Sequence, residues 1–329
     1  MREKIPPLET LHQMYYYMAL SRAIDTRLWQ LGRQGKAHFV ITPAGHEAAQ
    51  VGAAMALRQG YDYFVPYYRD MTMCLAAGMT ARDMLLHVRG APEDPSSGGR
   101  QMFGHFSRRD LNIVSGSSSV GSQMLHAVGL ALAFRNRGED RVTLTGFGEG
   151  ATSEGDWHEA MNFAAIHQLR VIFFCENNGY AISVPAHLEI GRVGVADKAA
   201  AYGMPGIRVD GNDILAVYET VSAAHAQTRA GGGPILIEAM TYRLLPHSNA
   251  DDDSKYRASE EVQAARARDP ITQFSTWLKD QQLMSDAEQQ TMDARITQEV
   301  DAATEYAYSR PEPTEELLYQ HVYAPGRTA

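Results

Sequence analysis

Residues whose types suit metal and anion chemistry lie close together between Gly146 and Ser183, a stretch that begins GFGEGATSEGD and ends ENNGYAIS. Two glycines flank Glu149, so the backbone can approach a diphosphate closely while the carboxylate offers a hard oxygen to Mg²⁺. One predicted helix and one predicted strand later, Asn178 returns to the same edge of the fold and adds an amide oxygen. The backbone carbonyl of Tyr180 can add a third oxygen, which leaves octahedral positions for diphosphate oxygens and a water.

Taken separately, both motifs are common turn sequences. A Gly-x-Gly turn recurs in βα units, and Asn-Asn-Gly is an ordinary turn signal. The helix predicted between them would point its N-terminal end at the same anion. The separation of one helix and one strand is therefore what makes the combination informative.

A second candidate region is YRLLPHSNADDDSKYR, which follows a predicted strand. His247 is an acid/base candidate because it lies where a strand end would face a bound cofactor. The acidic run Asp251–Asp253 is by default a solvated loop. His105, in GRQMFGHFS, either faces a substrate channel or packs within the protein or on its surface.

Composition limits the classes of partner. The net charge is -9 and the basic residues are scattered, so no basic face is available for a nucleic acid. Cys74 and Cys175 have no metal-ligand spacing, and we expect both to be reduced and buried. The longest uncharged stretch, Leu111–Phe134, is too polar to span a membrane. The N-terminus resembles neither a signal peptide nor an import leader, so we expect a cytoplasmic protein.

The first third of the chain is predicted to be helical. Apolar residues recur at helical spacing from Leu8 to about Gly35. Two further helical stretches are predicted, at ITPAGHEAAQVGAAMAL and at MTMCLAAGMTARDMLLHVRG. Residues 91–107 are rich in Gly, Pro and Ser and predict a long loop, either on the surface or forming part of a site.

From Gln123 onward, helices alternate with strands at RVTLTGF, RVIFFCENN, GIRVDG and PILIEAMTYRLL. This order predicts a doubly wound, mostly parallel α/β fold, whose ligands lie beyond the carboxyl ends of the strands. The C-terminal part is helical and polar, with a capping box at Ser285 and Glu288. We expect a helical N-terminal segment with a site loop at 1–110, an α/β core that binds diphosphate and Mg²⁺ at 111–255, and a helical C-terminal extension at 256–329.

The paired motifs resemble the thiamine-diphosphate motif, which begins Gly-Asp-Gly and ends Asn-Asn. More specifically, the chain resembles the alpha subunits of 2-oxo acid dehydrogenases of the branched-chain type, in which Glu replaces the Asp, as Glu149 does here. The ligand atom is unchanged by this replacement. The resemblance covers nearly the whole chain and is carried by GHEAAQVGAA, YYRD, GRQM, FGEGATSEGD, ENNGYAIS, IRVDGNDILAVY, EAMTYR and PHSNADDDSKYR.

The resemblance implies roles for individual residues. His247 matches the active-site histidine, and the metal ligands would be Glu149, Asn178 and the carbonyl of Tyr180. The family has an arginine where this chain has Glu176, so a diphosphate contact from that position is not expected to be retained. Residues expected to bind thiamine diphosphate are Tyr68, Arg69, Ser118, Gly148, Gly150, Ala151, Ile182, Arg243 and His247.

Two further features follow from the resemblance. Some branched-chain relatives hold a monovalent cation in the loop that matches SGSSSVGSQ, which implies a K⁺ site here. Ser248 occupies the place of a serine that is phosphorylated in animal relatives. The oxygens available to K⁺ would come from Ser117, Ser119, Ser122 and Gln123.

The implied reaction needs a second chain. Thiamine diphosphate supplies a carbon nucleophile that attacks the 2-oxo acid and holds the carbanion after CO₂ leaves. In the resembled family the glutamate that activates the cofactor belongs to the beta subunit, so we expect an α2β2 heterotetramer. The acyl group would pass to a lipoyl group on an acyltransferase core, which is the activity of 3-methyl-2-oxobutanoate dehydrogenase.

Other functions stay open. Pyruvate and acetoin dehydrogenase alpha subunits are the alternatives within the enzyme class, although they typically read Gly-Gly-Ser-Met-His where this chain reads GRQM. A diphosphate-binding module without catalysis is the alternative outside it. A dinucleotide-binding oxidoreductase lacks support, because no G-x-G-x-x-G with a following ribose-binding acid occurs after the first strand.

Overall fold

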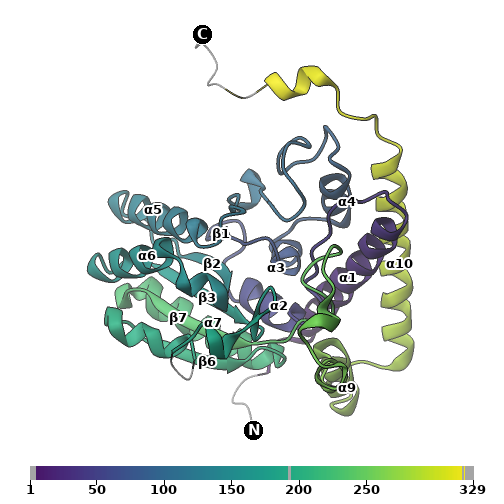
Figure 1. The fold of residues 1–329 in the computed structure, drawn as a ribbon. Coiled ribbons are helices and arrows are strands. Elements are labelled where there is room, and N and C mark those ends of the chain that lie inside the picture. Colours follow the sequence, from purple (N-terminus) through teal and green to yellow (C-terminus); the bar gives the residue numbers. More distant parts are fainter. Residues whose placement is uncertain (1–4, 192–193, 321, 323–329) are drawn as a thin grey trace.

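A five-stranded parallel sheet forms the centre of the molecule, which a computed structural model describes for residues 5–191, 194–320 and 322 (Figure 1). The strand order is β1-β2-β3-β7-β6, and every neighbouring pair is parallel. A short antiparallel pair, β4 (Tyr180–Ala181) and β5 (Val184–Pro185), lies outside this sheet. The strands of the main sheet are β1 (Tyr63–Val65), β2 (Thr143–Gly148), β3 (Val171–Asn177), β6 (Gly206–Asp210) and β7 (Ile235–Met240). The predicted fold class is confirmed.

Helices cover both faces of the sheet, so its central strands are apolar on both sides. Along β3, Ile172 and Phe174 belong to one core cluster, while Phe173 and Cys175 belong to the other. This is the period of two expected for a strand. The first cluster also contains residues from α2 (Glu47–Met55), α3 (Met71–Ala76) and α7 (Ile214–Gln227). The second contains residues from α5 (Ser122–Asn136) and α6 (Gly155–Ile166).

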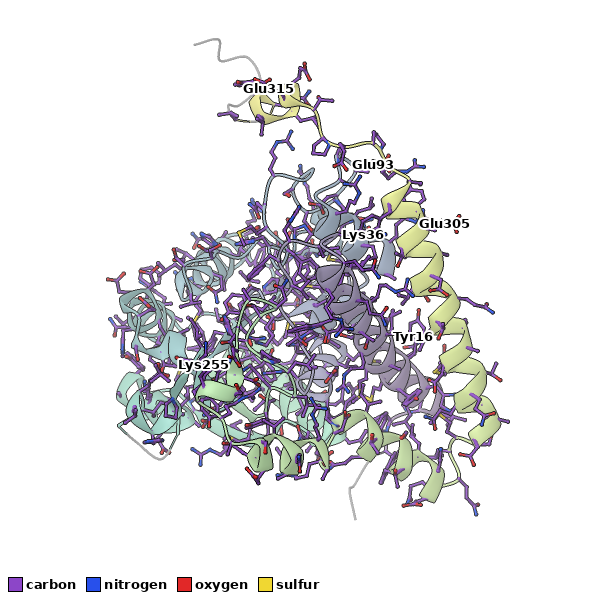
Figure 2. All side chains as sticks on the ribbon, turned by 45° about the vertical axis from the view of Figure 1, so that its right-hand side comes forward. Tyr16, Lys36, Glu93, Lys255, Glu305 and Glu315 are labelled. Atoms are coloured by element: carbon purple, nitrogen blue, oxygen red, sulfur yellow. The ribbon has the colours of Figure 1, made fainter. Side chains whose placement is uncertain are left out.

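The two ends of the chain pack together. Helix α1 (Leu8–Arg33) lies beside α10 (Asp286–Tyr308), and α4 (Ala81–Arg89) also packs on α10. Figure 2 shows Tyr16 between α1 and α10, where its hydroxyl donates to Glu299 at 2.6 Å. The remaining C-terminal elements are α8 (Ser259–Arg266), α9 (Pro270–Asp280) and η7 (Glu315–Tyr319), the last standing away from the body of the molecule.

Several details of the predicted secondary structure were wrong. The helix predicted over residues 41–57 is confined to Glu47–Met55, and the strand predicted over residues 234–245 ends at Met240. The single helix predicted at MTMCLAAGMTARDMLLHVRG is two helices, because Gly78 has φ 111° and Thr80 then starts α4 with a capping box to Asp83. Strand β1 was missed, since three residues are too few to show a period. The free, buried state of Cys74 and Cys175 is confirmed. The loop at 91–107 and the capping box at Ser285 are confirmed as well.

The three predicted segments share one core. Strand β1 comes from the 1–110 segment but pairs with β2, and the first core cluster runs from Leu11 through Ile172 to Ala307. The division into 1–110, 111–255 and 256–329 stays a prediction, and its outer ends fall outside the described residues. Within the described part of the chain, no helix is both long enough and apolar enough to cross a bilayer.

Candidate functional site

A pocket of about 370 Å³ lies where β2 and β3 end. Because the strands are parallel, the residues that follow them meet at one edge of the sheet. Except for Ser118, all the residues predicted to bind thiamine diphosphate or Mg²⁺ line this pocket, namely Tyr68, Arg69, Gly148, Glu149, Gly150, Ala151, Asn178, Tyr180, Ile182, Arg243 and His247. The structure therefore brings together residues that lie as far apart in the sequence as 68 and 247.

The carboxylate of Glu149 is buried, and only one of its two oxygens accepts a hydrogen bond from the described residues. Its Oε2 accepts a hydrogen bond from the backbone N–H of Asn178 at 3.1 Å, whereas its Oε1 has no partner in the part of the chain that the structure describes. Burial raises the pKa of Glu149 to about 6. The side-chain oxygen of Asn178 accepts from the backbone N–H of Tyr180 at 3.2 Å. A buried carboxylate oxygen without a donor is an open position for a cation.

Two buried guanidinium groups face the same pocket. Arg69 is 2% exposed and Arg243 is 1% exposed, and neither forms an ion pair with a carboxylate of the described residues. Arg69 donates to the carbonyl of Thr42 at 2.6 Å, and Arg243 donates to the carbonyl of Ile182 at 2.7 Å. The Nε atoms of both arginines have no hydrogen-bond partner among the described residues. Burial and the neighbouring charge of Arg69 lower the pKa of Arg243.

His247 is oriented by these two arginines. Its Nδ1 lies 3.1 Å from an Nη of Arg69 and 3.3 Å from an Nη of Arg243. A guanidinium only donates, so Nδ1 must be the acceptor and the ring proton is assigned to Nε2. Burial and the two neighbouring positive charges lower the pKa of His247 to about 3. The ring is therefore neutral, with an N–H donor at Nε2.

The two glycines beside Glu149 have different surroundings. A Cβ at Gly150 would lie 2.5 Å from the Cβ of Ala181, so only glycine lets this turn approach β4. A Cβ at Gly148 would meet no atom within 4 Å. Gly148 therefore leaves open space beside the carboxylate, as a bound group would require.

The serine-rich loop is only partly connected to the pocket. Ser118 forms a hydrogen bond with Nε2 of His105 at 2.7 Å and does not line the pocket, so its contact with a cofactor stays a prediction. The side chain of Gln123 lines the pocket and bonds to the backbone of Gly121 and Gly146. Ser122 donates to Asp156 at 2.9 Å. The expected K⁺ site likewise stays a prediction.

Sequence reasoning missed a buried acid pair beneath the pocket. Glu176 accepts from the amide of Gln50 at 2.8 Å and has no atom in the pocket lining. Asp70 is also fully buried, and burial together with the charge of Glu176 raises its pKa well above the usual range. Burial also raises the pKa of Glu176. One proton shared by the two carboxyls would relieve their repulsion.

Two other residues near the metal candidates were also missed. Glu189 lines the pocket, and its buried Oε2 has no hydrogen-bond partner among the described residues. His46 is fully buried, and its Nε2 lies 3.4 Å from the side-chain nitrogen of Asn178. Neither belongs to a motif with an evident chemical purpose. Among the described residues, no group of three or more His, Cys, Asp or Glu side chains is arranged to hold a metal, and the predicted Mg²⁺ site has only one carboxylate.

Comparison with known proteins identifies the family. Residues 15–316 match the family model described as the dehydrogenase E1 component. The chain is 50% identical over 311 residues to "2-oxoisovalerate dehydrogenase subunit alpha" of Bacillus subtilis, with 94% of each chain covered. It is 41% identical to "3-methyl-2-oxobutanoate dehydrogenase subunit alpha" of Mycobacterium tuberculosis, over 97% of this chain and 84% of the relative. It is 36% identical to the mitochondrial "2-oxoisovalerate dehydrogenase subunit alpha" of Homo sapiens, over 96% of this chain and 71% of the relative. The chain therefore belongs to the dehydrogenase E1 component family.

Proposed function

We propose that this chain is the alpha subunit of the decarboxylating component of a 2-oxo acid dehydrogenase that acts on branched-chain 2-oxo acids. One observation carries the proposal: two buried guanidinium groups that form no ion pair with the described residues line the same pocket as a buried carboxylate oxygen with no donor among those residues. Such a site is complementary to an anion and a cation bound together. The names of the bacterial and human relatives support the branched-chain substrate.

The residues fit the cofactor that the family implies. Thiamine diphosphate, when bound, supplies the carbon nucleophile for decarboxylation. Arg69 and Arg243 would neutralise the diphosphate, with help from the backbone N–H groups at Gly150 and Ala151. Magnesium would be held by Glu149, Asn178 and the carbonyl of Tyr180. These assignments would give ligands to the Glu149 carboxylate and to the guanidinium groups of Arg69 and Arg243.

His247 would hold a proton at Nε2 and offer it to the reacting acyl group. The two arginines fix Nδ1 as the acceptor, which leaves Nε2–H as the ring's donor. A diphosphate bound to the arginines would offset their charges, and this would raise the proton affinity of the ring. His247 would thus become a better general acid or base when the site is loaded.

Partners complete the reaction. A beta subunit would supply the glutamate that activates the cofactor in an α2β2 heterotetramer, and the word "subunit" in the names of the relatives supports such a partner. The acyl group would pass to a lipoyl-bearing acyltransferase core. The expected cytoplasmic location stays a prediction.

Reconstitution tests the proposal. The purified chain should show no decarboxylation of 3-methyl-2-oxobutanoate with thiamine diphosphate and Mg²⁺, and activity should appear when the beta partner is added. A Glu149→Ala tetramer serves as the inactive control. With the partner present, kcat/KM should be higher for 3-methyl-2-oxobutanoate than for pyruvate.

Three outcomes would contradict parts of the proposal. Turnover by the chain alone would show that no partner is needed. A clear preference for pyruvate would indicate the alternative substrate class. Tight binding of thiamine diphosphate by a reconstituted tetramer that never turns over any 2-oxo acid would indicate a binding module.

A further inference from the structure

His46 contacts a proposed metal ligand from behind the pocket. Its imidazole is fully buried, does not line the pocket, and places Nε2 3.4 Å from the side-chain nitrogen of Asn178. The proposed function assigns no role to this histidine. A buried ring that accepts a hydrogen bond from the NH₂ group of a metal-binding amide can nevertheless fix which end of that amide faces the metal.

The orientation of the Asn178 amide matters because its two ends differ. Only the oxygen can bind Mg²⁺, whereas the NH₂ group is a donor that would repel a cation. The oxygen accepts from the backbone N–H of Tyr180 at 3.2 Å, and the NH₂ group points at Nε2 of His46. In the reversed orientation the NH₂ group would meet the N–H of Tyr180, and two donors would face each other.

The ring is held in place by its backbone. The N–H of His46 donates to the carbonyl of Pro43 at 2.8 Å, and its carbonyl accepts from Gln50 at 3.0 Å. Gly45, with φ 97°, brings this turn against the residues after β7, since a Cβ there would lie 1.9 Å from the carbonyl oxygen of Tyr242. The carbonyl of Ala44 also accepts from Leu244 at 3.0 Å. The turn that carries His46 is therefore fixed to the segment that carries Arg243.

We propose that His46 is a positioning residue that accepts a hydrogen bond from the Asn178 amide and so keeps the amide oxygen turned toward the metal. Acceptance at Nε2 requires the ring proton on Nδ1. That atom is buried and has no hydrogen-bond partner among the described residues. The inference rests on the proposed function, because it takes Asn178 as a Mg²⁺ ligand.

The test measures the Mg²⁺ requirement for cofactor binding in the α2β2 tetramer without substrate. Titration calorimetry of thiamine diphosphate at a series of Mg²⁺ concentrations gives the Mg²⁺ concentration for half-maximal binding. His46→Leu removes the acceptor and His46→Met leaves only a weak thioether acceptor, and we expect this concentration to rise about tenfold, the size of one hydrogen bond. His46→Gln offers an acceptor oxygen and should stay within about threefold of wild type. At saturating Mg²⁺, the kcat of all three variants should be close to that of wild type.

A second background separates positioning from a general structural role. In Asn178→Asp both side-chain ends are oxygens, so no orientation has to be enforced. His46→Leu should then change the Mg²⁺ requirement by less than about threefold, as a double-mutant cycle would show for a lost coupling. An equal effect of His46→Leu in both backgrounds would overturn the proposal.

The remaining outcomes are also decisive. If Asn178→Ala leaves the Mg²⁺ requirement unchanged, the metal assignment fails and this proposal fails with it. If Asn178→Ala weakens Mg²⁺-dependent binding but His46→Leu and His46→Met do not, only the role of His46 is wrong. If His46→Leu and His46→Met both fail to assemble while His46→Gln assembles, His46 is required for folding, and the proposal is overturned.

Discussion

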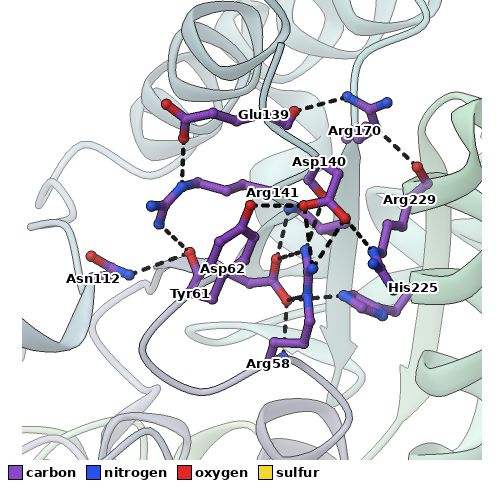
Figure 3. Close-up of polar contacts among 11 residues, drawn as sticks. Arg58, Tyr61, Asp62, Asn112, Glu139, Asp140, Arg141, Arg170, His225 and Arg229 are labelled. Carbon is purple, nitrogen blue, oxygen red and sulfur yellow. Dashed lines mark hydrogen bonds and ion pairs between the residues drawn. The ribbon is translucent and has the colours of Figure 1, made fainter. Parts of the chain in front are cut away.

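The same sheet carries charged residues at both of its ends, and the two groups are built differently. At the amino ends of the strands, a cluster that we call the amino-end cluster surrounds Asp62 and Asp140 (Figure 3). Asp62 accepts from Arg58 at 2.8 Å, from the N–H of Val142 at 2.9 Å and from His225 at 2.9 Å. Its residues are Arg58, Tyr61, Asp62, Asp140, Arg141, His225 and Arg229. Every ionised group around Asp62 and Asp140 thus has an opposite partner.

At the carboxyl ends the charges are not paired. Arg69 and Arg243 have no carboxylate partner among the described residues, and Glu149 keeps one oxygen without a donor. Unpaired buried charges cost stability, so this arrangement persists only if something else completes it. The paired charges of the amino-end cluster are therefore suited to stabilising the fold, whereas the unpaired charges of the pocket are suited to binding a ligand.

The largest effect is expected for His247→Ala. General acid–base contributions are about 10²–10⁴-fold, so the variant tetramer should transfer acyl groups to an isolated lipoyl domain at least about 10²-fold more slowly. The measurement is reductive acylation at saturating thiamine diphosphate and Mg²⁺. His225→Ala is the matched control, because it removes a histidine that bonds to Asp62 and should leave acyl transfer near the wild-type rate. A His247→Ala tetramer that transfers at the wild-type rate would show that His247 is structural.

Arg243→Met should separate binding from stability. The variant loses a charged donor to the diphosphate, so the Kd for thiamine diphosphate should rise about 10- to 100-fold. Burial disfavours the charge of Arg243, so the unfolding free energy without ligand should be unchanged or higher. Calorimetry and urea unfolding measure the two quantities. Loss of stability without loss of affinity would mean that Arg243 belongs with the paired charges.

Arg58→Met should give the opposite result. Asp62 is fully buried and would lose a bidentate partner, so unfolding should become easier by about 1–3 kcal/mol. The cofactor site lies at the other end of the sheet, and the Kd for thiamine diphosphate should not change. Urea unfolding and calorimetry on the same variant provide both values. A weakened Kd would imply that the two ends of the sheet are coupled.

The sequence predicted the site better where its residues are close in the chain. Glu149 and Asn178 are separated by one helix and one strand, so the parallel topology alone brings them together. His46 and Glu189 come from a turn and a loop whose positions depend on packing, and no local pattern marks them. Glu176 lies in the ENN motif but faces away, because the period of two places it on the same face as Ile172 and Phe174. Resemblance supplied Arg69 and Arg243, which composition and spacing did not single out, and it gave a family role to His247, which its place at a strand end had already marked as a candidate.

The smallest effect is expected for Glu149→Gln, which tests whether the unpaired carboxylate costs stability. The pKa of Glu149 is raised by burial from 4.5 to about 6, so the folded state binds more protons than the unfolded state between these values. Stability from this group is therefore fully present below about pH 4.5 and is lost as the pH rises through about 6. Without Mg²⁺, the variant and wild type should unfold at the same urea concentration at pH 4. At pH 8 the variant should be more stable by about 1–2 kcal/mol.

Asp62→Asn is the matched control, and its effect on stability should have the opposite sign. Although burial alone raises the pKa of Asp62, its bonds to His225 and Arg58 lower it overall, so wild type should gain stability over that variant above about pH 4. Thiamine diphosphate with Mg²⁺ at pH 8 should then stabilise wild type more than Glu149→Gln, because only the carboxylate completes the metal site. If Glu149→Gln is less stable than wild type at pH 8 without Mg²⁺, the carboxylate is already satisfied within the fold, and the contrast between the two ends of the sheet does not hold for this residue.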